Sequence, residues 1–108
     1  MLTIEKKGEK IYDAALPRGD NGELELSING YNLETGDKII FKLGKDLNRP
    51  IIKKIVTDFF DNCLSVSLLP AETNKLLIGK YFYVVKLIKS DGEVDTLIEK
   101  SVFTLEDS

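Results

Sequence analysis

The sequence contains no histidine and no tryptophan, and it has a single cysteine, Cys63. Without histidine, the chain lacks Ser-His-Asp and Cys-His nucleophilic centres, histidine-based proton transfer and most zinc sites. One cysteine allows no disulfide within the chain. We therefore expect a protein that is not an enzyme and that holds no metal or other cofactor.

Long apolar runs are missing as well. The first ten residues, MLTIEKKGEK, lack the apolar centre of a secretory signal peptide, and no run approaches the ~20 residues that span a bilayer. These absences predict that the chain is not secreted by a signal peptide and has no membrane partner. We expect it to stay in a reducing cytosol, or to leave without the secretory route, as a virus particle released by lysis does.

Positive charge is in deficit, with 15 Lys and Arg against 18 Asp and Glu, a net charge of -3 and a pI of about 5.0. Domains that bind nucleic acid usually carry a basic excess, so the balance argues against such a partner. The chain has 108 residues, of which 43% are apolar and 31% charged. These values predict one globular domain over residues 1–108.

Apolar and polar residues alternate along much of the chain, which is the pattern of half-buried strands. The strand at Lys80–Ile88 is apolar on its second face too, which predicts a central strand covered on both sides. The apolar positions of the four clearest strands are Leu24, Leu26 and Ile28; Ile39, Phe41 and Leu43; Leu64, Val66 and Leu68; and Tyr81, Tyr83, Val85 and Leu87.

The remaining segments complete an all-β pattern. Ile51–Val56 predicts an edge strand protected by its lysines, and an early strand is expected within Leu2–Ala14. Val94–Leu105 is interrupted at Glu99–Ser101, which indicates a bulge or a strand switch. Pro70–Leu76 predicts one helical turn. The count predicts an Ig-like β-sandwich of about seven antiparallel strands with one short helical turn.

Two connections carry specific expectations. Asp91-Gly92 between alternating segments predicts a hairpin with a type I′ turn and positive φ at both residues. In Ig-like sandwiches, an aromatic residue near the start of the sixth strand pins the preceding corner. We expect Tyr81 and Tyr83 to be buried, with at least one hydroxyl bonded to backbone near the prolyl turn, and Leu76 or Leu77 to enter the core.

Four motifs give the chain a family resemblance. They are Gly36-Asp37 before a strand, Leu-x-Pro-x-x-Thr-x-x-Leu at 68–76, Gly-x-Tyr-x-Tyr at 79–83, and Asp91-Gly92 before Thr-Leu-Ile at 96–98. This order resembles the small Ig-like modules of tailed-phage and prophage virion proteins, and is similar to the N-terminal domain of siphophage upper baseplate proteins. The resemblance covers about the C-terminal two-thirds of the chain. It departs at Val84-Val85, where the family often has an acidic residue, and at Lys100, near which it often has a glycine.

Several short motifs have a structural and a functional interpretation. Arg18-Gly19-Asp20 spells an integrin-type tripeptide but also fits a β-turn, which is the interpretation we favour. Two groups of residues could supply calcium ligands: Asp20, Asn21 and Glu23, or Asp58, Asp61 and Asn62. An EF-hand loop that opens at Asp20 is excluded, because Gly22 and Tyr31 stand at positions where the loop needs ligand side chains. We expect these carboxylates to be solvated. Hydrolysis by two carboxylates stays open, although a small sandwich leaves little room for a deep cleft.

Phe59-Phe60 lies between strands, where we expect one ring in the core and one available for contact with a partner. Lys53-Lys54 is interpreted as protection of an edge strand, and Cys63 as a small filler without thiol reactivity. The resemblance implies a structural protein of a phage or prophage tail or baseplate, located in the virion or, before assembly, in the host cytoplasm. It would dock on other virion proteins, with possible homo-oligomers, through an end loop or a terminal strand edge. The alternative is a carbohydrate- or cell-surface-binding module.

Overall fold

The computed structural model describes residues 2–5, 13–28 and 31–107. These residues form eight strands and one helical turn, so the all-β prediction and the single turn are confirmed, with one strand more than the seven expected. Part of the range predicted for the early strand, residues 6–12, lies outside the described residues. The elements are β1 (Leu2–Glu5), β2 (Ala14–Pro17), β3 (Gly22–Ser27), β4 (Lys38–Gly44), β5 (Ile52–Val56), β6 (Cys63–Leu68), α1 (Pro70–Thr73), β7 (Gly79–Ile88) and β8 (Val94–Glu106).

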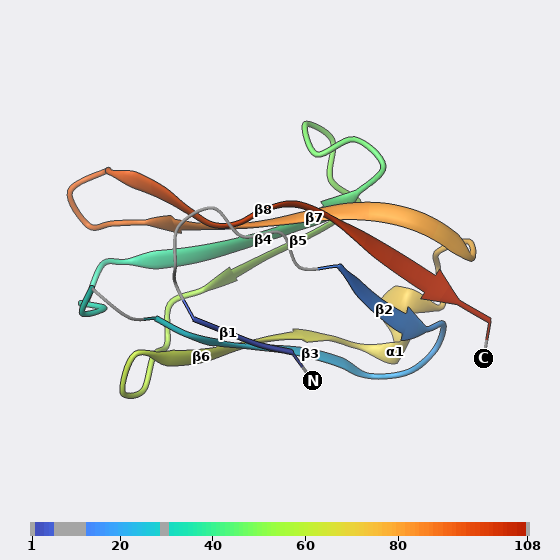
Figure 1. Ribbon diagram of the computed structural model, residues 1–108, viewed down its shortest axis with the longest axis horizontal. Coiled ribbons are helices and arrows are strands. Elements are labelled where there is room, and N and C mark those ends of the chain that lie inside the picture. Colours follow the sequence, from blue (N-terminus) through green and yellow to red (C-terminus); the bar gives the residue numbers. More distant parts are fainter. Residues whose placement is uncertain (1, 6–12, 29–30, 108) are drawn as a thin grey trace.

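The strands form two sheets, one ordered β1-β3-β6 and the other β2-β8-β7-β4-β5. Figure 1 shows them as two layers, with β1, β3 and β6 in one and β4, β5, β7 and β8 in the other. The prediction of antiparallel strands throughout is wrong, because β1 runs parallel to β3 and β2 runs parallel to β8. Alternation shows which face of a strand is buried, but it carries no information about strand direction.

The core lies between the layers and is built from the alternating residues that the sequence indicates. In the register of β3 with β6, Leu26 lies opposite Leu64, and both are buried. From the other sheet, the Tyr83 ring lies 5.8 Å from that of Phe41 and contacts Phe103 edge-on at 6.2 Å. Aromatic pairs at such separations add to the stabilisation that burial provides.

Strand β7 is central, between β8 and β4, as predicted. The prediction that it is covered on both faces holds only in part. On the outer side of the sheet Val84 is buried, whereas Phe82 and Lys86 are half-buried and Lys80 is exposed. There the Lys100 ammonium lies 4.3 Å from the centroid of the Phe82 ring. The lysine side chain covers apolar surface in place of another layer of the fold.

Strand β8 contains the predicted bulge rather than a strand switch. Tyr83 pairs with Ser101, but Val85 pairs with Ile98, so β8 has one extra residue within Glu99-Lys100. A second extra residue, Leu97, follows because Lys86 pairs with Thr96. Such bulges increase twist locally and let one long strand continue across a curved sheet.

The corner before β7 is formed as predicted. The Tyr81 ring is buried and its hydroxyl donates to the Leu77 carbonyl at 2.6 Å. Leu76 enters the core while Leu77 is exposed. Gly79 has a φ of 147°, a conformation that favours glycine at the start of β7.

The hairpin between β7 and β8 exists, but its predicted type I′ turn is wrong. Gly92 has a positive φ of 93°, whereas Asp91 does not. The Gly92 N–H donates to the Lys89 carbonyl, and the Lys89 N–H donates to the Glu93 carbonyl. This is the pattern of a three-residue loop closed by a left-handed glycine. Asp91 instead accepts the Glu93 N–H with its side chain.

Candidate docking end

Three connections that are distant in sequence meet at one end of the molecule: residues 31–37, 57–62 and 89–93. We call them the loop end; Figure 1 shows them at the end of the long axis opposite α1. Two polar side chains, Asp37 and Asn62, join them. Surface loops on a rigid scaffold are common sites of molecular recognition.

Asp37 joins the first connection to the hairpin. The residue is 1% exposed. One oxygen, Oδ2, accepts the Tyr31 hydroxyl at 2.8 Å and the Glu34 N–H at 2.9 Å, while Oδ1 accepts the Ser90 N–H at 2.8 Å. Gly36, with a φ of 99°, precedes it. A buried charge needs such partners, and three donors satisfy this one.

These contacts shift two pKa values in opposite directions. Burial by itself raises the pKa of Asp37, but the hydrogen bonds from Glu34, Tyr31 and Ser90 together outweigh burial and lower it. The hydrogen bond to the Asp37 carboxylate is the largest cause that raises the pKa of Tyr31, to about 12. The pair is therefore a carboxylate with a protonated phenol over a wide range of pH.

Asn62 joins the first connection to the turn before β6. Its Oδ1 accepts the Leu33 N–H at 2.9 Å, and its amide donates to the Tyr31 carbonyl at 3.2 Å. Asp61 and Asn62 have φ values of 54° and 60°, and Phe60 and Cys63 exchange both backbone hydrogen bonds. Two left-handed residues between such a pair are typical of a type I′ turn. The structure therefore has this turn geometry at Asp61-Asn62, within the segment between β5 and β6.

The turn presents an aromatic side chain. Phe60 is 85% exposed, whereas Phe59 is half-buried against the core, so the expected division between the two rings is confirmed. Asp58 and Asp61 flank the pair and are exposed. The loop end thus combines an exposed ring with acidic side chains on a turn held in place by hydrogen bonds.

The other predicted site residues have structural surroundings. Arg18-Gly19-Asp20 is a turn, as favoured: the Asp20 N–H donates to the Pro17 carbonyl, and the Gly19 N–H donates to the hydroxyl of buried Thr73. Asn21 and Glu23 are exposed beside it. Among residues 2–5, 13–28 and 31–107, no group of three or more acidic or cysteine side chains could hold a metal ion. Cys63 lies on β6 but is exposed, so its interpretation as a packing filler is wrong.

The lysine pair on β5 divides between two roles. β5 is an edge strand, as predicted. Lys54 forms an ion pair with Glu72 of α1 at 2.7 Å, and Glu72 also accepts the Leu69 N–H. The hydrogen bond from Lys54 is the largest cause that lowers the pKa of Glu72. Lys53 points to the outer face instead. β2 pairs with β8 only at Phe103–Glu106, so the β8 edge is covered there. Among the described residues, no strand pairs with the rest of β8 on the side away from β7.

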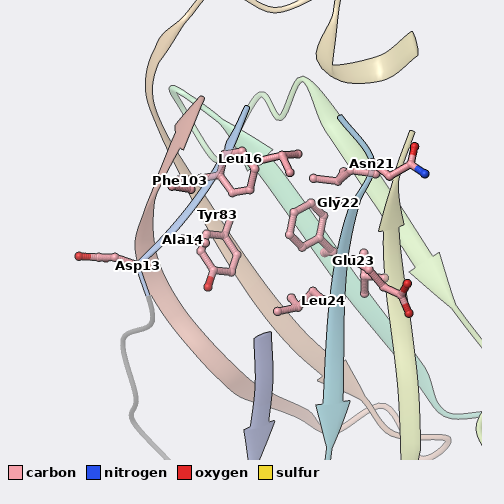
Figure 2. A pocket seen from close by; sticks show the side chains of 13 residues that line it. Asp13, Ala14, Leu16, Asn21, Gly22, Glu23, Leu24, Tyr83 and Phe103 are labelled. Atoms are coloured by element: carbon pink, nitrogen blue, oxygen red, sulfur yellow. The ribbon is translucent and has the colours of Figure 1, made fainter. Parts of the chain in front are cut away.

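A cavity of about 290 Å³ opens between β2 and β3. Figure 2 shows the rings of Tyr83 and Phe103 within its lining, and Asp13 pointing away from it. Asp13 accepts the Val102 N–H, and Glu23 accepts the Ser65 hydroxyl. The carboxylates of Asp13 and Glu23 therefore have partners outside the cavity and do not converge on a ligand within it.

No family model matches the chain, and a search of curated proteins finds no similar sequence. In the part of the chain that the structure describes, no helix has the length and apolar character needed to cross a membrane. The sequence analysis missed the two side chains that join the loop end. For Asp37, the Gly-Asp pair before a strand is a sequence signal that could have drawn attention to it. For Asn62 there is no local signal, because its contacts are made with residues about 30 positions away in the sequence.

Proposed function

We propose that the chain is a non-catalytic docking module with an Ig-like sandwich fold, and that it serves in a phage or prophage tail or baseplate. The strand pairings support the fold. In Ig-like domains, the second and fifth strands pair in one sheet, and the third, sixth and seventh lie together in the other. The β3–β6 pair and the β4–β7–β8 order have this arrangement. The parallel pairing of β2 with β8 is compatible with an initial strand divided between the sheets.

The tail or baseplate assignment rests on the family resemblance, and the motifs that carry this resemblance have structural roles in the chain. Asp37 of Gly36-Asp37 joins two connections, Thr73 of the prolyl motif binds the Gly19 N–H, and Tyr81 pins the corner. Gly92 closes the hairpin with its positive φ. The resemblance therefore rests on residues that determine the fold, in the part of the chain that it covers.

The observation that carries the docking function is the exposed Phe60 ring. A large aromatic side chain with 85% exposure stands directly before a two-residue turn, and the turn is anchored by Asn62. Aromatic residues are enriched at the centres of protein interfaces. Because the backbone of the turn is already held by hydrogen bonds, binding would cost little backbone conformational freedom there. The loop end is therefore suited to insert Phe60 into a pocket of a partner.

Co-expression with phage tail and baseplate proteins, taken first from any encoded beside the reading frame, tests this function. We expect the wild-type chain to capture one of them and Phe60→Ser to lose that capture. Leu77→Ser is the matched control, because Leu77 is 78% exposed and belongs to the connection between α1 and β7, outside the loop end. A wild-type chain that captures none of these proteins would refute the proposal. Binding of a glycan array instead, lost in Phe60→Ser, would favour the carbohydrate-binding alternative.

A further inference from the structure

The outer face of the five-stranded sheet carries a cluster of lysines. Along β4, β5 and β7, core residues alternate with residues that face outward. The Lys100 ammonium lies over the outward Phe82 ring, so Lys100 belongs to the same face. The outward positions of β4, β5 and β7 include no acidic residue, whereas in the bulge of β8 Glu99 is the neighbour of Lys100. Together with Lys100, we call their lysines the lysine face: Lys38, Lys42, Lys53, Lys80, Lys86 and Lys100.

The lysine face is electrostatically unfavourable in the isolated chain. Lys42 lies directly opposite Lys53 in the register of β4 with β5, and Lys86 is a diagonal neighbour of Lys42 through Val84. Like charges at opposed positions destabilise a sheet. Within the described ranges, none of the six lysines has a carboxylate oxygen within 4.0 Å. A partner that brings carboxylates would relieve this repulsion.

Apolar side chains lie beside this repulsive pair. Ile40 of β4 is opposite Ile55 of β5, and Ile55 is 55% exposed. The next residue pair along the same two strands on this face is Lys42 with Lys53. The surface is thus an apolar patch with positive charge along its side. Its complement is an exposed apolar side chain flanked by carboxylates.

The loop end of the same chain has that composition. Phe60 is exposed between Asp58 and Asp61. The two neighbouring connections add the exposed acids Glu34, Asp91 and Glu93, of which Glu93 is ion-paired with Lys89 of the same connection at 3.4 Å. Although the net charge is only -3, the charges are unevenly distributed, with acidic residues at the loop end and lysines on the lysine face.

We propose that the loop end of one copy docks on the lysine face of a second copy. Phe60 packs on Ile40 and Ile55, and the carboxylates of Asp58 and Asp61 lie near Lys42 and Lys53. The two surfaces differ, so the contact is head-to-tail. Each copy keeps a free loop end or a free lysine face after one contact, and repetition gives a ring if the rotation closes or a filament if it does not.

This inference names a partner for the docking surface proposed above, and it depends on that function only through Phe60. The two proposals can fail separately. Self-association without capture of a tail or baseplate protein would leave this inference standing and remove the virion assignment. If the chain captures such a protein but stays monomeric at every concentration, the virion assignment stands and the head-to-tail contact is refuted.

Sedimentation velocity on two complementary variants tests the head-to-tail contact. Phe60→Ser removes the aromatic contact, and Lys53→Glu/Ile55→Ser alters the lysine face; circular dichroism checks that each variant is folded. We expect wild-type chain to form larger species as concentration rises, with weaker association at high salt. Each variant alone should associate at least about tenfold more weakly. Leu77→Ser should behave as wild type.

Mixing the two variants gives the decisive result. An intact loop end on Lys53→Glu/Ile55→Ser can dock on an intact lysine face of Phe60→Ser, so the equimolar mixture should form dimers and no larger species. A mixture that stays monomeric, or a Phe60→Ser variant that associates like wild type, would overturn the proposal. A monomeric wild-type chain that binds a single-stranded oligonucleotide through Lys53 would also overturn it, and would assign the lysine face to a polyanion.

Discussion

Replacing Asp37 by asparagine tests the network that holds the loop end together. The carboxylate accepts three hydrogen bonds, from Tyr31, Glu34 and Ser90. Asparagine has nearly the same shape, but only one of its side-chain atoms accepts, so its NH₂ group must face at least one of these donors. One hydrogen bond is therefore lost, and the others lose the contribution of the negative charge.

The expected cost follows from these contacts. Hydrogen bonds to charged groups contribute about 1.5–3 kcal/mol each, and water can reach some of the freed donors, so we expect Asp37→Asn to lower the free energy of unfolding by about 2–4 kcal/mol at pH 7. Glu34→Gln removes an exposed negative charge from the same connection and is the matched control. It should change stability by less than about 0.5 kcal/mol.

The effect of Asp37→Asn should depend on pH. The folded state lowers the pKa of Asp37, so its stabilising contribution is fully present above the unfolded-state pKa of about 3.9 and is lost as pH falls below it. Urea unfolding followed by circular dichroism should show a gap between wild type and Asp37→Asn that narrows in acid. Equal stability at pH 7, or a gap of the same size well below pH 3.9, would refute the role given to this carboxylate.

Three further perturbations address other parts of the fold. Tyr81→Phe removes the 2.6 Å hydrogen bond to Leu77 and should cost about 1 kcal/mol in chemical unfolding; unchanged stability would contradict the corner. Gly92→Val should cost about 1–2 kcal/mol from its φ of 93° alone, because no heavy atom lies within 4 Å of the added Cβ, and Gly92→Asn should recover part of the loss in a thermal melt. The folded state raises the pKa of Tyr31 to about 12, so the stability that its protonated hydroxyl contributes is present below pH ~10 and lost as pH rises through 12. Ultraviolet titration should detect this late ionisation, and Tyr31→Phe should remove it.

Much of the fold could be predicted because burial imposes a period of two on each strand. The alternation at Leu24–Ile28 and Ile39–Leu43 identified residues that are inward-facing in the structure, and Pro70 marked the single helical turn. Strand direction was not predictable in this way, so the parallel pairing of β2 with β8 was missed. The turn type at Asp91-Gly92 was wrong because the chain has a three-residue loop there, with Asp91 outside the left-handed region.

The candidate site was predictable only in part. The division between Phe59 and Phe60 followed from two adjacent aromatics beside a turn. Asn62 could not be recognised as an anchor, because its partners become neighbours only after the chain folds. The lysine face was hidden by the net charge of -3, which sums the whole chain and says nothing about which face each charge occupies.

The central claim is that this chain acts by docking through Phe60, and that its lysine face receives the loop end of another copy. Amide chemical shifts measured by NMR during dilution test this claim most directly. The account predicts that two separated groups of signals shift together, one from residues 58–61 at the loop end and one from Lys42, Lys53 and Ile55 on the lysine face. It also predicts that both groups stop shifting in Phe60→Ser. Shifts confined to β1 and β2, or no concentration dependence in the wild-type chain, would contradict it.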